Sequence, residues 1–297
     1  MSAPVPNCAR ARKALLLIGS ALMTALQAAG HEAVGLSRAR GRGLHWNPDQ
    51  GELDPVAGFE GVVNLCGATI GGRFTDRRKA LIRESRVKGT DLLARAMASA
   101  SPLPQVLVNG SAVGYYGNRG DTELTEESPA GGGFLSEVCR AWEGATAPAR
   151  DAGVRVVSVR TGLVLDGRGG VLPRVMLPVK LGVGGKIGDG RQWWSWISLA
   201  DEVRAIMHCL TTPGLEGPVN LCSPEPLPNR VFMKKLAKAL HRPALVPAPA
   251  FALRALLSTE TANELLLSSQ RVMPAKLATS GFVFRHPTLD EALAALL

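Results

Sequence analysis

The chain has few of the residues on which several classes of protein depend. Its 297 residues include 5 cysteines, 2 tyrosines and only 5% aromatic residues. The cysteines are odd in number, widely spaced and without a C-x-x-C pair, which argues against a disulfide framework and a zinc site. They are Cys8, Cys66, Cys139, Cys209 and Cys222. This pattern predicts a protein of the cytoplasm, a reducing compartment, with no bound metal.

Long apolar runs are also missing, since no segment reaches the length that spans a membrane. One shorter run, ALLLIGSALMTAL, follows Arg10, Arg12 and Lys13 and has the arrangement of a signal peptide. The alternative, which we favour, is that residues 18–29 form the first helix of an α/β domain and that Gly30 ends it. No membrane partner is then expected.

Positive charge is in excess, with a formal net charge of +9. The basic residues are scattered, apart from those within residues 38–42 and 77–79. No aromatic residues alternate with them and no nucleic-acid-binding motif occurs, so the sequence favours a small phosphate-bearing ligand over nucleic acid. A solvated basic surface accounts for most of the excess.

Strand-like runs alternate with helical stretches along the first three quarters of the chain. Strands are expected at residues 32–37, 61–65, 105–109, 154–159 and 218–222, and helices at residues 76–99, 134–152 and 201–211. This order predicts an α/β fold with a Rossmann-like, doubly wound parallel sheet and right-handed crossovers. The glycine- and tryptophan-rich residues 161–196 are expected to be loops that line a ligand cleft.

The composition changes at Ser223, where the segment SPEPLP contains three prolines. Helical segments are expected beyond it, at residues 229–240, 250–257, 260–267 and 290–296. We therefore predict a dinucleotide-binding domain over residues 1–223, in which residues 1–17 are atypical, and a small, mostly helical C-terminal domain over residues 224–297.

The glycine turn of a dinucleotide-binding fold is almost absent. A G-x-x-G-x-x-G turn that ended at Gly19 would need glycine at the positions of Leu16 and Lys13. Glycine at such positions permits positive φ and lets a pyrophosphate approach the helix N-terminus. A Cβ opposes both, so we expect a weak grip on the pyrophosphate, which Lys13→Gly and Leu16→Gly should strengthen.

Two short motifs nevertheless suit a dinucleotide. Asn64, Leu65, Cys66 and Gly67 follow a strand at the point where a cofactor-binding loop leaves the sheet, although an ordinary strand exit explains them too. In the second motif, Ser37 and Arg38 end the second strand, where an NAD site has an acidic residue for the ribose 2′-hydroxyl.

Arginine at this second position suits a 2′-phosphate, so NADP is the expected cofactor, and Arg42 and Arg86 add positive charge. An exposed basic loop is the alternative explanation.

Candidate groups for chemistry and for substrate follow later strands. Ser111 ends a strand and Tyr116 lies five residues on, so this pair is a candidate to polarise a substrate oxygen and move a proton. Arg160, Arg191 and Trp193 are candidates for the substrate side. Packing of a loop by the tyrosine and of the core by the tryptophans are the alternatives.

Several long segments carry a resemblance: NLCGATIGGRFTDRRKALIRESRVKGT, SAVGYYGNRGD, LTEESPAGGGFLSEVCRAWE, VRTGLVLDGRGG, LGVGGKIGDGRQWWSWI and ELLLSSQRVMPAKLATSGFVFRHPTLDEAL. They resemble the extended short-chain dehydrogenase/reductase superfamily, and within it the atypical NAD(P)-dependent epimerase/dehydratase proteins with a C-terminal domain of unknown function. The resemblance implies NADP bound across the strand tips. It puts the following residues at the cofactor: Gly19, Ser37, Arg38, Leu65, Cys66, Arg86 and Leu163.

The superfamily's usual catalytic motif, Y-x-x-x-K, is absent, and Phe134 and Val138 stand where its Tyr and Lys are expected. Three hypotheses therefore remain. The leading one is an NADP-dependent epimerase or oxidoreductase with non-standard catalytic residues, acting on a small polar or nucleotide-linked substrate, with a homodimer as the candidate assembly. The second is a non-catalytic, NADP-responsive binding protein. The third is an inactive variant whose glycine turn is damaged, for example by a frame slip upstream of Leu17.

Overall fold

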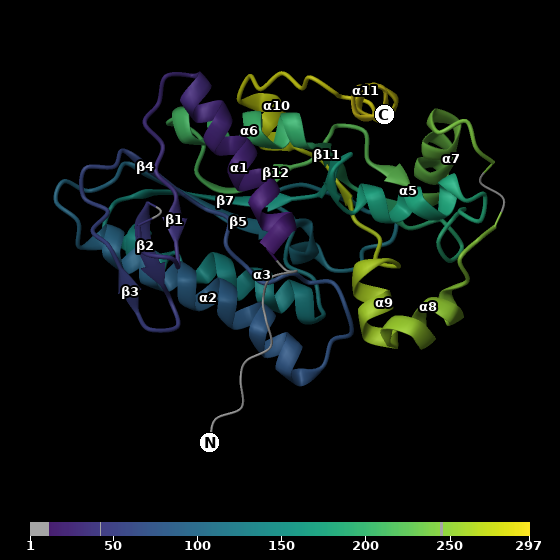
Figure 1. The fold of residues 1–297 in the computed structure, drawn as a ribbon, viewed down its shortest axis with the longest axis horizontal. Coiled ribbons are helices and arrows are strands. Elements are labelled where there is room, and N and C mark those ends of the chain that lie inside the picture. The colour runs from purple at the N-terminus through teal and green to yellow at the C-terminus, as the bar shows by residue number, and fades with distance from the viewer. Residues whose placement is uncertain (1–11, 42, 244–245) are drawn as a thin grey trace.

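The computed structural model describes residues 12–41, 43–243 and 246–297, with the side chains of the first helix from Ile18 onward. Its centre is a four-stranded parallel sheet in the order β12-β7-β5-β4 (Figure 1). The strands are β4 (Gly61–Asn64), β5 (Val106–Ala112), β7 (Arg155–Thr161) and β12 (Gly217–Leu221). Each is one of the strands that the sequence predicts, so the α/β parallel-sheet prediction is confirmed.

Helices cover both faces of this sheet. On one face lie α2 (Asp76–Ala98), α3 (Phe134–Gly144) and α4 (Ala147–Asp151), and on the other lie α1 (Arg12–Ala28) and α6 (Leu199–Thr211) (Figure 1). Successive residues of a strand point to opposite faces. Val106 and Val108 accordingly pack in the core under α1 and α6, while Leu107 packs against α2 and α4. Burial on both faces explains why these strands are nearly continuous apolar runs.

The sheet is interrupted where a doubly wound fold has its first strand. The three strands that precede β4 in the chain form a separate sheet, in which the first two are parallel. The three strands are β1 (Leu36–Ser37), β2 (Leu44–Asn47) and β3 (Glu52–Leu53). Within the part of the chain that the structure describes, no strand joins β1 to β4. In agreement with this open edge, Val62 and Val63 of β4 are only half-buried, whereas Val106 to Ser111 of β5 are all buried.

The expected turn positions are helical. Lys13 and Leu16 lie within α1, which begins at Arg12, six residues before the helix that the sequence predicts. No glycine turn is formed at these positions, and the expected weak grip on the pyrophosphate stays a prediction. The reason is local, because the run from Lys13 to Leu17 consists of lysine, alanine and leucine, all strong helix formers, with no glycine or proline to end a helix.

Glycine at position 16 should accordingly weaken the fold. We expect Leu16→Gly to lower the free energy of unfolding by about 1 kcal/mol relative to Leu16→Ala, since glycine costs about that much in a helix interior. Leu16→Ala is the matched control because it removes the same side chain and keeps helix propensity. Urea unfolding followed by circular dichroism measures the difference. Equal stabilities for the two variants would mean that residue 16 is not helical in solution.

Two further predictions were only partly right. The helix expected over residues 134–152 is divided into α3 and α4, because Pro148 at the start of α4 has no N–H for a continuous helix. Residues 161–196, expected to be loops, contain regular elements. They are β8 (Leu163–Asp166), β9 (Gly169–Gly170), α5 (Leu172–Lys180), β10 (Trp193–Trp194) and, ending at residue 198, β11 (Trp196–Ser198).

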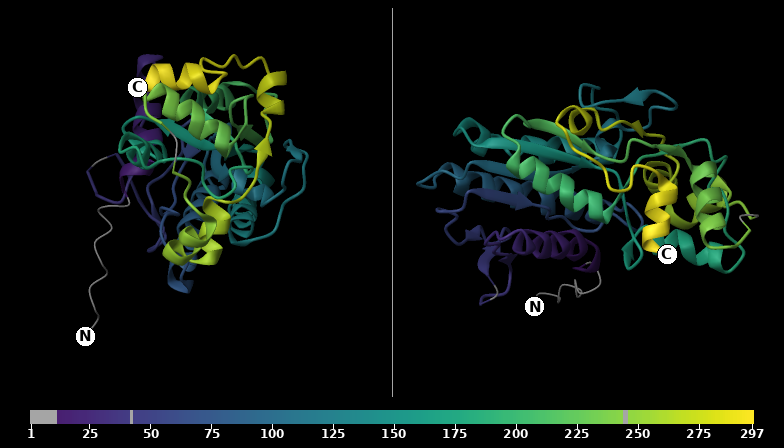
Figure 2. Two further views of the ribbon diagram at one scale, coloured as in Figure 1. Left: turned by 90° about the vertical axis from the view of Figure 1, so that its right-hand side faces the viewer. Right: turned by 90° about the horizontal axis from the view of Figure 1, so that it is seen from above.

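The C-terminal part is mostly helical and is joined to the first part by short strands. Its elements are β13 (Leu227–Pro228), α7 (Asn229–Ala239), α8 (Ala250–Leu257), α9 (Thr259–Leu265), β14 (Arg271–Val272), α10 (Ala275–Thr279) and α11 (Leu289–Leu296), which lies beside α7 (Figure 2). β14 pairs with β6 (Glu123–Leu124), and β13 pairs with β10. No helix in the described ranges is long and apolar enough to cross a membrane.

Candidate functional site

A row of polar side chains crosses the sheet near the carboxyl ends of its strands. Ser111 of β5, Arg160 of β7 and Asn220 of β12 are neighbours in register. All three are buried, in strands otherwise rich in valine. Ligands of open α/β sheets bind outside the carboxyl ends of the strands, so this row is the place to look for a reactive centre.

A carboxylate from α3 joins two members of this row. Glu143 accepts a hydrogen bond from Ser111 Oγ at 2.6 Å and two from Arg160, from Nε and Nη2, at 2.9 Å each. The side chain of Arg160 is 3% exposed and that of Glu143 is 16% exposed. Burial alone would lower the pKa of Arg160, but the hydrogen bonds and charge of Glu143 raise it above its ordinary value. The pair is therefore a buried, doubly hydrogen-bonded ion pair.

The two tyrosines surround Arg160. Tyr116 belongs to the 3₁₀ helix η2 (Val113–Tyr116), is fully buried, donates to Asn220 Oδ1 at 2.7 Å and accepts from Arg160 Nη1 at 3.1 Å. Burial raises the pKa of Tyr116 to about 12, although Arg160 opposes the rise. Tyr115 is half-buried, and its ring stacks on the Arg160 guanidinium at 3.4 Å. The hydroxyl of Tyr116, the candidate proton carrier, therefore already has two hydrogen-bond partners within the protein, and its raised pKa disfavours ionisation.

A second polar row lies two residues earlier and shapes the loop after β4. Asn64 Nδ2 donates to Asn109 Oδ1 at 2.7 Å and to Thr90 Oγ1 at 2.8 Å, while Asn64 Oδ1 accepts the N–H of Cys66 at 3.2 Å. Trp142 Nε1 donates to the same threonine oxygen at 3.0 Å. The amide of Asn64 is therefore fully committed to holding the loop.

Arg86 closes the other side of this loop. Its Nη1 donates to the carbonyls of Ala68 and Ile82, both at 3.0 Å, and burial lowers its pKa. A Cβ at Gly67 would lie 2.8 Å from the guanidinium carbon, so glycine lets this arginine approach the backbone. Leu65 packs against the hydrophobic core beneath α1, and Ile18 of α1 packs against the same core. The structure thus brings together the predicted loop at residues 64–67 and Arg86.

The remaining predicted cofactor residues lie in three other places. Ser37 ends β1 and Arg38 follows it at the surface, where Ser37 Oγ accepts the N–H of Ala39 at 3.1 Å. Gly19 lies inside α1, beyond the helix's first turn. Leu163 begins β8, where its N–H donates to Ser195 at 2.8 Å and its side chain packs against the core of the C-terminal part.

The predicted substrate residues do not form one cluster either. Arg191 is exposed, Arg160 is paired with Glu143, and Trp193 Nε1 donates to Asp121 Oδ1 at 2.8 Å. Trp194 and Trp196 belong to the core, as the packing alternative expects.

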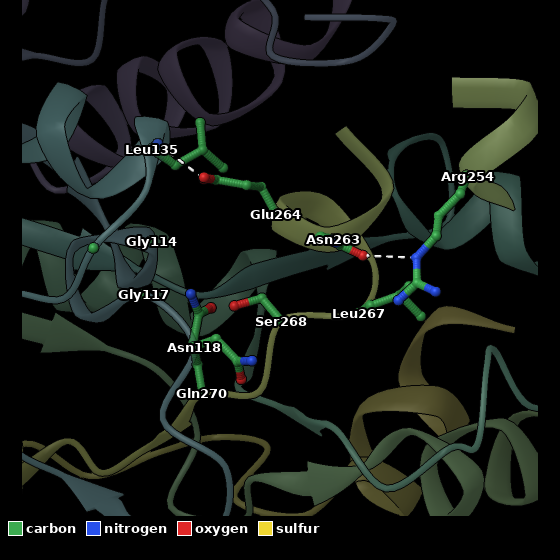
Figure 3. Close-up of a pocket in the computed structure, with 11 residues that line it drawn as sticks. Gly114, Gly117, Asn118, Leu135, Arg254, Asn263, Glu264, Leu267, Ser268 and Gln270 are labelled. Carbon is green, nitrogen blue, oxygen red and sulfur yellow. Dashed lines mark hydrogen bonds between the residues drawn. The ribbon is translucent and has the colours of Figure 1, made fainter. Parts of the chain in front are cut away.

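A cavity of about 320 Å³ lies between η2, the start of α3, and the pair α8–α9 (Figure 3). Glu264 of α9 reaches across to α3, where its two carboxylate oxygens accept the N–H groups of Phe134 at 2.8 Å and Leu135 at 2.9 Å. The lining is mostly polar and consists of Gly114, Gly117, Asn118, Gly132, Leu135, Arg254, Asn263, Glu264, Leu267, Ser268 and Gln270. Sequence reasoning assigned no role to these residues, although the segment ELLLSSQRVMP, which contains four of them, carries the resemblance.

A family model described as "NAD dependent epimerase/dehydratase family" matches residues 17–222. The chain belongs to this family. A second model, for a domain of unknown function (DUF1731), matches residues 248–296. The resemblance inferred from the motifs is thereby confirmed. The family match begins inside α1, after the positions of Lys13 and Leu16.

Relatives in this family cover nearly the whole chain. An epimerase family protein of Mycobacterium bovis is 45% identical over 283 residues, which are 93% of each chain. The crystal structure of human epimerase family protein SDR39U1 with NADPH has a TM-score of 0.88 at 32% identity and covers 94% of this chain and 95% of that one. A nucleoside-diphosphate sugar epimerase from Corynebacterium glutamicum has a TM-score of 0.77 at 37% identity over 94% of this chain and 56% of that chain.

The family's dinucleotide fits one end of this site and not the other. At the position expected for the 2′-phosphate, Arg38 is 55% exposed, and among the described residues its ion-pair partner is the still more exposed Asp49, at 3.3 Å, so its charge is available to a phosphate. At the pyrophosphate end, the N–H of Gly19 lies within α1 and is not one of the free amides of a helix N-terminus. The described residues therefore offer no glycine turn to the pyrophosphate.

Proposed function

We propose that the chain binds NADP(H) along the carboxyl ends of β1, β4 and β5 and acts as an oxidoreductase or epimerase. Its substrate is a small polar or nucleotide-linked molecule held in the cavity between η2 and α9. The observation that carries the proposal is the buried row of Ser111, Arg160 and Asn220, tied to Glu143, at the end of a family-typical sheet. The bound NADPH of the human relative and the assignment of the Corynebacterium relative as a nucleoside-diphosphate sugar epimerase support this choice of ligands.

The preference for NADP over NAD is assigned to Arg38. We expect Arg38→Ala to weaken NADPH binding about tenfold and NADH binding little, since a hydrogen bond to a charged group contributes about 1.5–3 kcal/mol. Arg40→Ala is the matched control, because Arg40 is 77% exposed on the same loop and pairs with Glu52 instead. Fluorescence titration with both cofactors measures the ratio. An unchanged NADPH-to-NADH ratio in Arg38→Ala would remove Ser37 and Arg38 from the cofactor site.

A non-catalytic, NADP-responsive binding protein is the second candidate, and the burial of Tyr116 together with the missing Y-x-x-x-K favours it. NADPH oxidation over a panel of small carbonyl compounds and nucleotide sugars separates the two functions. Reproducible turnover supports the enzyme, and saturable NADPH binding with no turnover supports the binding protein. Failure to bind NADPH at all supports the inactive variant, for which the other reading frames upstream of Leu17 should encode an apolar strand and G-x-x-G.

A further inference from the structure

The Ser111 hydroxyl already donates its proton within the protein, so toward a ligand it can act only as a hydrogen-bond acceptor. A serine hydroxyl has one proton, and in this structure Ser111 directs it at Glu143 Oε1, 2.6 Å away. Only its lone pairs remain for a substrate, and the buried Cys139 thiol lies within hydrogen-bonding reach of the same hydroxyl. The role expected from the sequence, in which Ser111 polarises a substrate oxygen by donating to it, needs this contact to break first.

The contact is difficult to break, because Glu143 is fixed from its other side. Arg160 holds both carboxylate oxygens, and the guanidinium is in turn stacked on Tyr115 and bonded to the Tyr116 hydroxyl. Removing one partner of a buried ion pair leaves an uncompensated charge, so this arrangement resists disruption. The carboxylate is thus oriented at Ser111 in advance of any ligand.

Other candidates for the proton-accepting group are weaker on geometry. Phe134 and Val138 occupy the positions of the missing Tyr and Lys, and Tyr116 already donates to Asn220 and accepts from Arg160. Cys139 of α3 is buried, and burial raises the pKa of its thiol to about 11. Tyr115 has no hydroxyl hydrogen bond to the described residues, which makes it the competing base.

We propose that Glu143 is a positioning residue through which Ser111 takes the proton of a substrate hydroxyl. The substrate O–H bond breaks and its proton bonds to Ser111 Oγ. In the same step the Ser111 proton moves to Glu143 Oε1, so the negative charge passes from the carboxylate to the substrate oxygen and every atom is conserved. The proposal rests on the proposed function. When bound, the nicotinamide would supply the hydride chemistry, which lies outside this proton step.

One test needs neither cofactor nor substrate. A hydroxyl proton held in a hydrogen bond this short and buried should exchange slowly and give a downfield proton NMR resonance. The resonance should disappear in Ser111→Ala and in Glu143→Gln. It should persist in the matched control Ser136→Ala, whose buried hydroxyl donates to backbone carbonyls instead. A wild-type spectrum without the resonance would overturn the proposal.

The second test uses the carbonyl panel. Glu143→Gln should lower kcat by about 100-fold or more, as loss of a positioned acid–base group does, with KM changed less than about threefold. Glu143→Asp should restore part of kcat, and the Ser111→Ala/Glu143→Gln double variant should be no slower than the slower single variant. The double result is expected because the two residues act as one unit.

The pH profile separates a proton relay from a structural effect. The pH profile of kcat should differ between the wild type and Glu143→Gln, because only the wild type has an ionisable group at this position. The ionisable groups around the pair are Arg160 from β7, Tyr115 and Tyr116 from η2, Cys139 from α3, Glu126 from the segment after β6 and, through Cys139, Arg86 from α2. All of these groups are present in both proteins, so a difference between the two profiles reports Glu143.

Two failures are distinguishable. A wild-type protein that binds NADPH and turns over nothing overturns the proposed function and the relay with it. An active protein in which Glu143→Gln keeps full kcat, while Tyr115→Phe loses it, overturns the relay alone and assigns the base to Tyr115.

Discussion

The free energy of unfolding should fall as the pH rises from about 4.5 to about 8, and Glu202→Gln should remove this fall. Glu202 lies in the first turn of α6 and is fully buried, and burial raises its pKa from 4.5 to about 8. Within this window the folded chain keeps a proton that the unfolded chain releases. The unfolded state therefore binds fewer protons, and stability decreases by about 1.4 kcal/mol per pH unit.

Glutamine should flatten the slope because it has the shape of a protonated glutamate at every pH. Glu202 Oε1 accepts from Thr161 Oγ1 at 2.9 Å, and Oε2 has no hydrogen-bond partner within the described part of the chain. Urea unfolding at a series of pH values gives both curves, and their difference isolates Glu202 because other groups contribute equally. The exposed Glu127→Gln serves as control and should keep the wild-type slope. Parallel curves for wild type and Glu202→Gln would mean that Glu202 is ionised in the folded protein.

The central sheet could be predicted from the sequence because its signal is local. The runs at β5 and β7 are buried almost throughout, those at β4 and β12 are short and partly buried, and each has a helix before or after it that the pattern also reveals. The first strand region could not be predicted in the same way. Residues 32–37 have a strand-like composition, yet only Leu36 and Ser37 form β1. Strand length depends on a partner, and within the described residues β1 has one partner, the short strand β2.

The candidate site was only partly predictable, for a different reason. Ser111 and Arg160 were both chosen from the sequence, but for separate roles, and their shared partner Glu143 was missed. Glu143 lies 32 residues from Ser111 and 17 from Arg160, and only packing of α3 against the sheet brings the three together. Glu264 was missed likewise, since its contact with α3 spans 130 residues.

Replacing Arg160 should cause a large loss of stability, because its buried guanidinium pairs with Glu143. Arg160→Met should lower the free energy of unfolding by about 3–5 kcal/mol, because it leaves the Glu143 carboxylate buried without its counter-charge. Methionine keeps much of the side-chain length, so the loss reports the charge more than a cavity. Chemical denaturation at neutral pH measures it.

A double variant decides whether the missing counter-charge is the cause. Arg160→Met/Glu143→Met removes both charges, and we expect it to recover most of the loss, because an apolar pair of similar volume replaces a buried ion pair at little net change. Arg95→Met is the control for a similar ion pair at the surface, where Arg95 is 69% exposed beside Asp91, and it should leave stability nearly unchanged. If Arg160→Met is no less stable than Arg95→Met, the Glu143 carboxylate is hydrated or protonated in the folded chain. Such a recovery would mean that the fold itself does not require the pair.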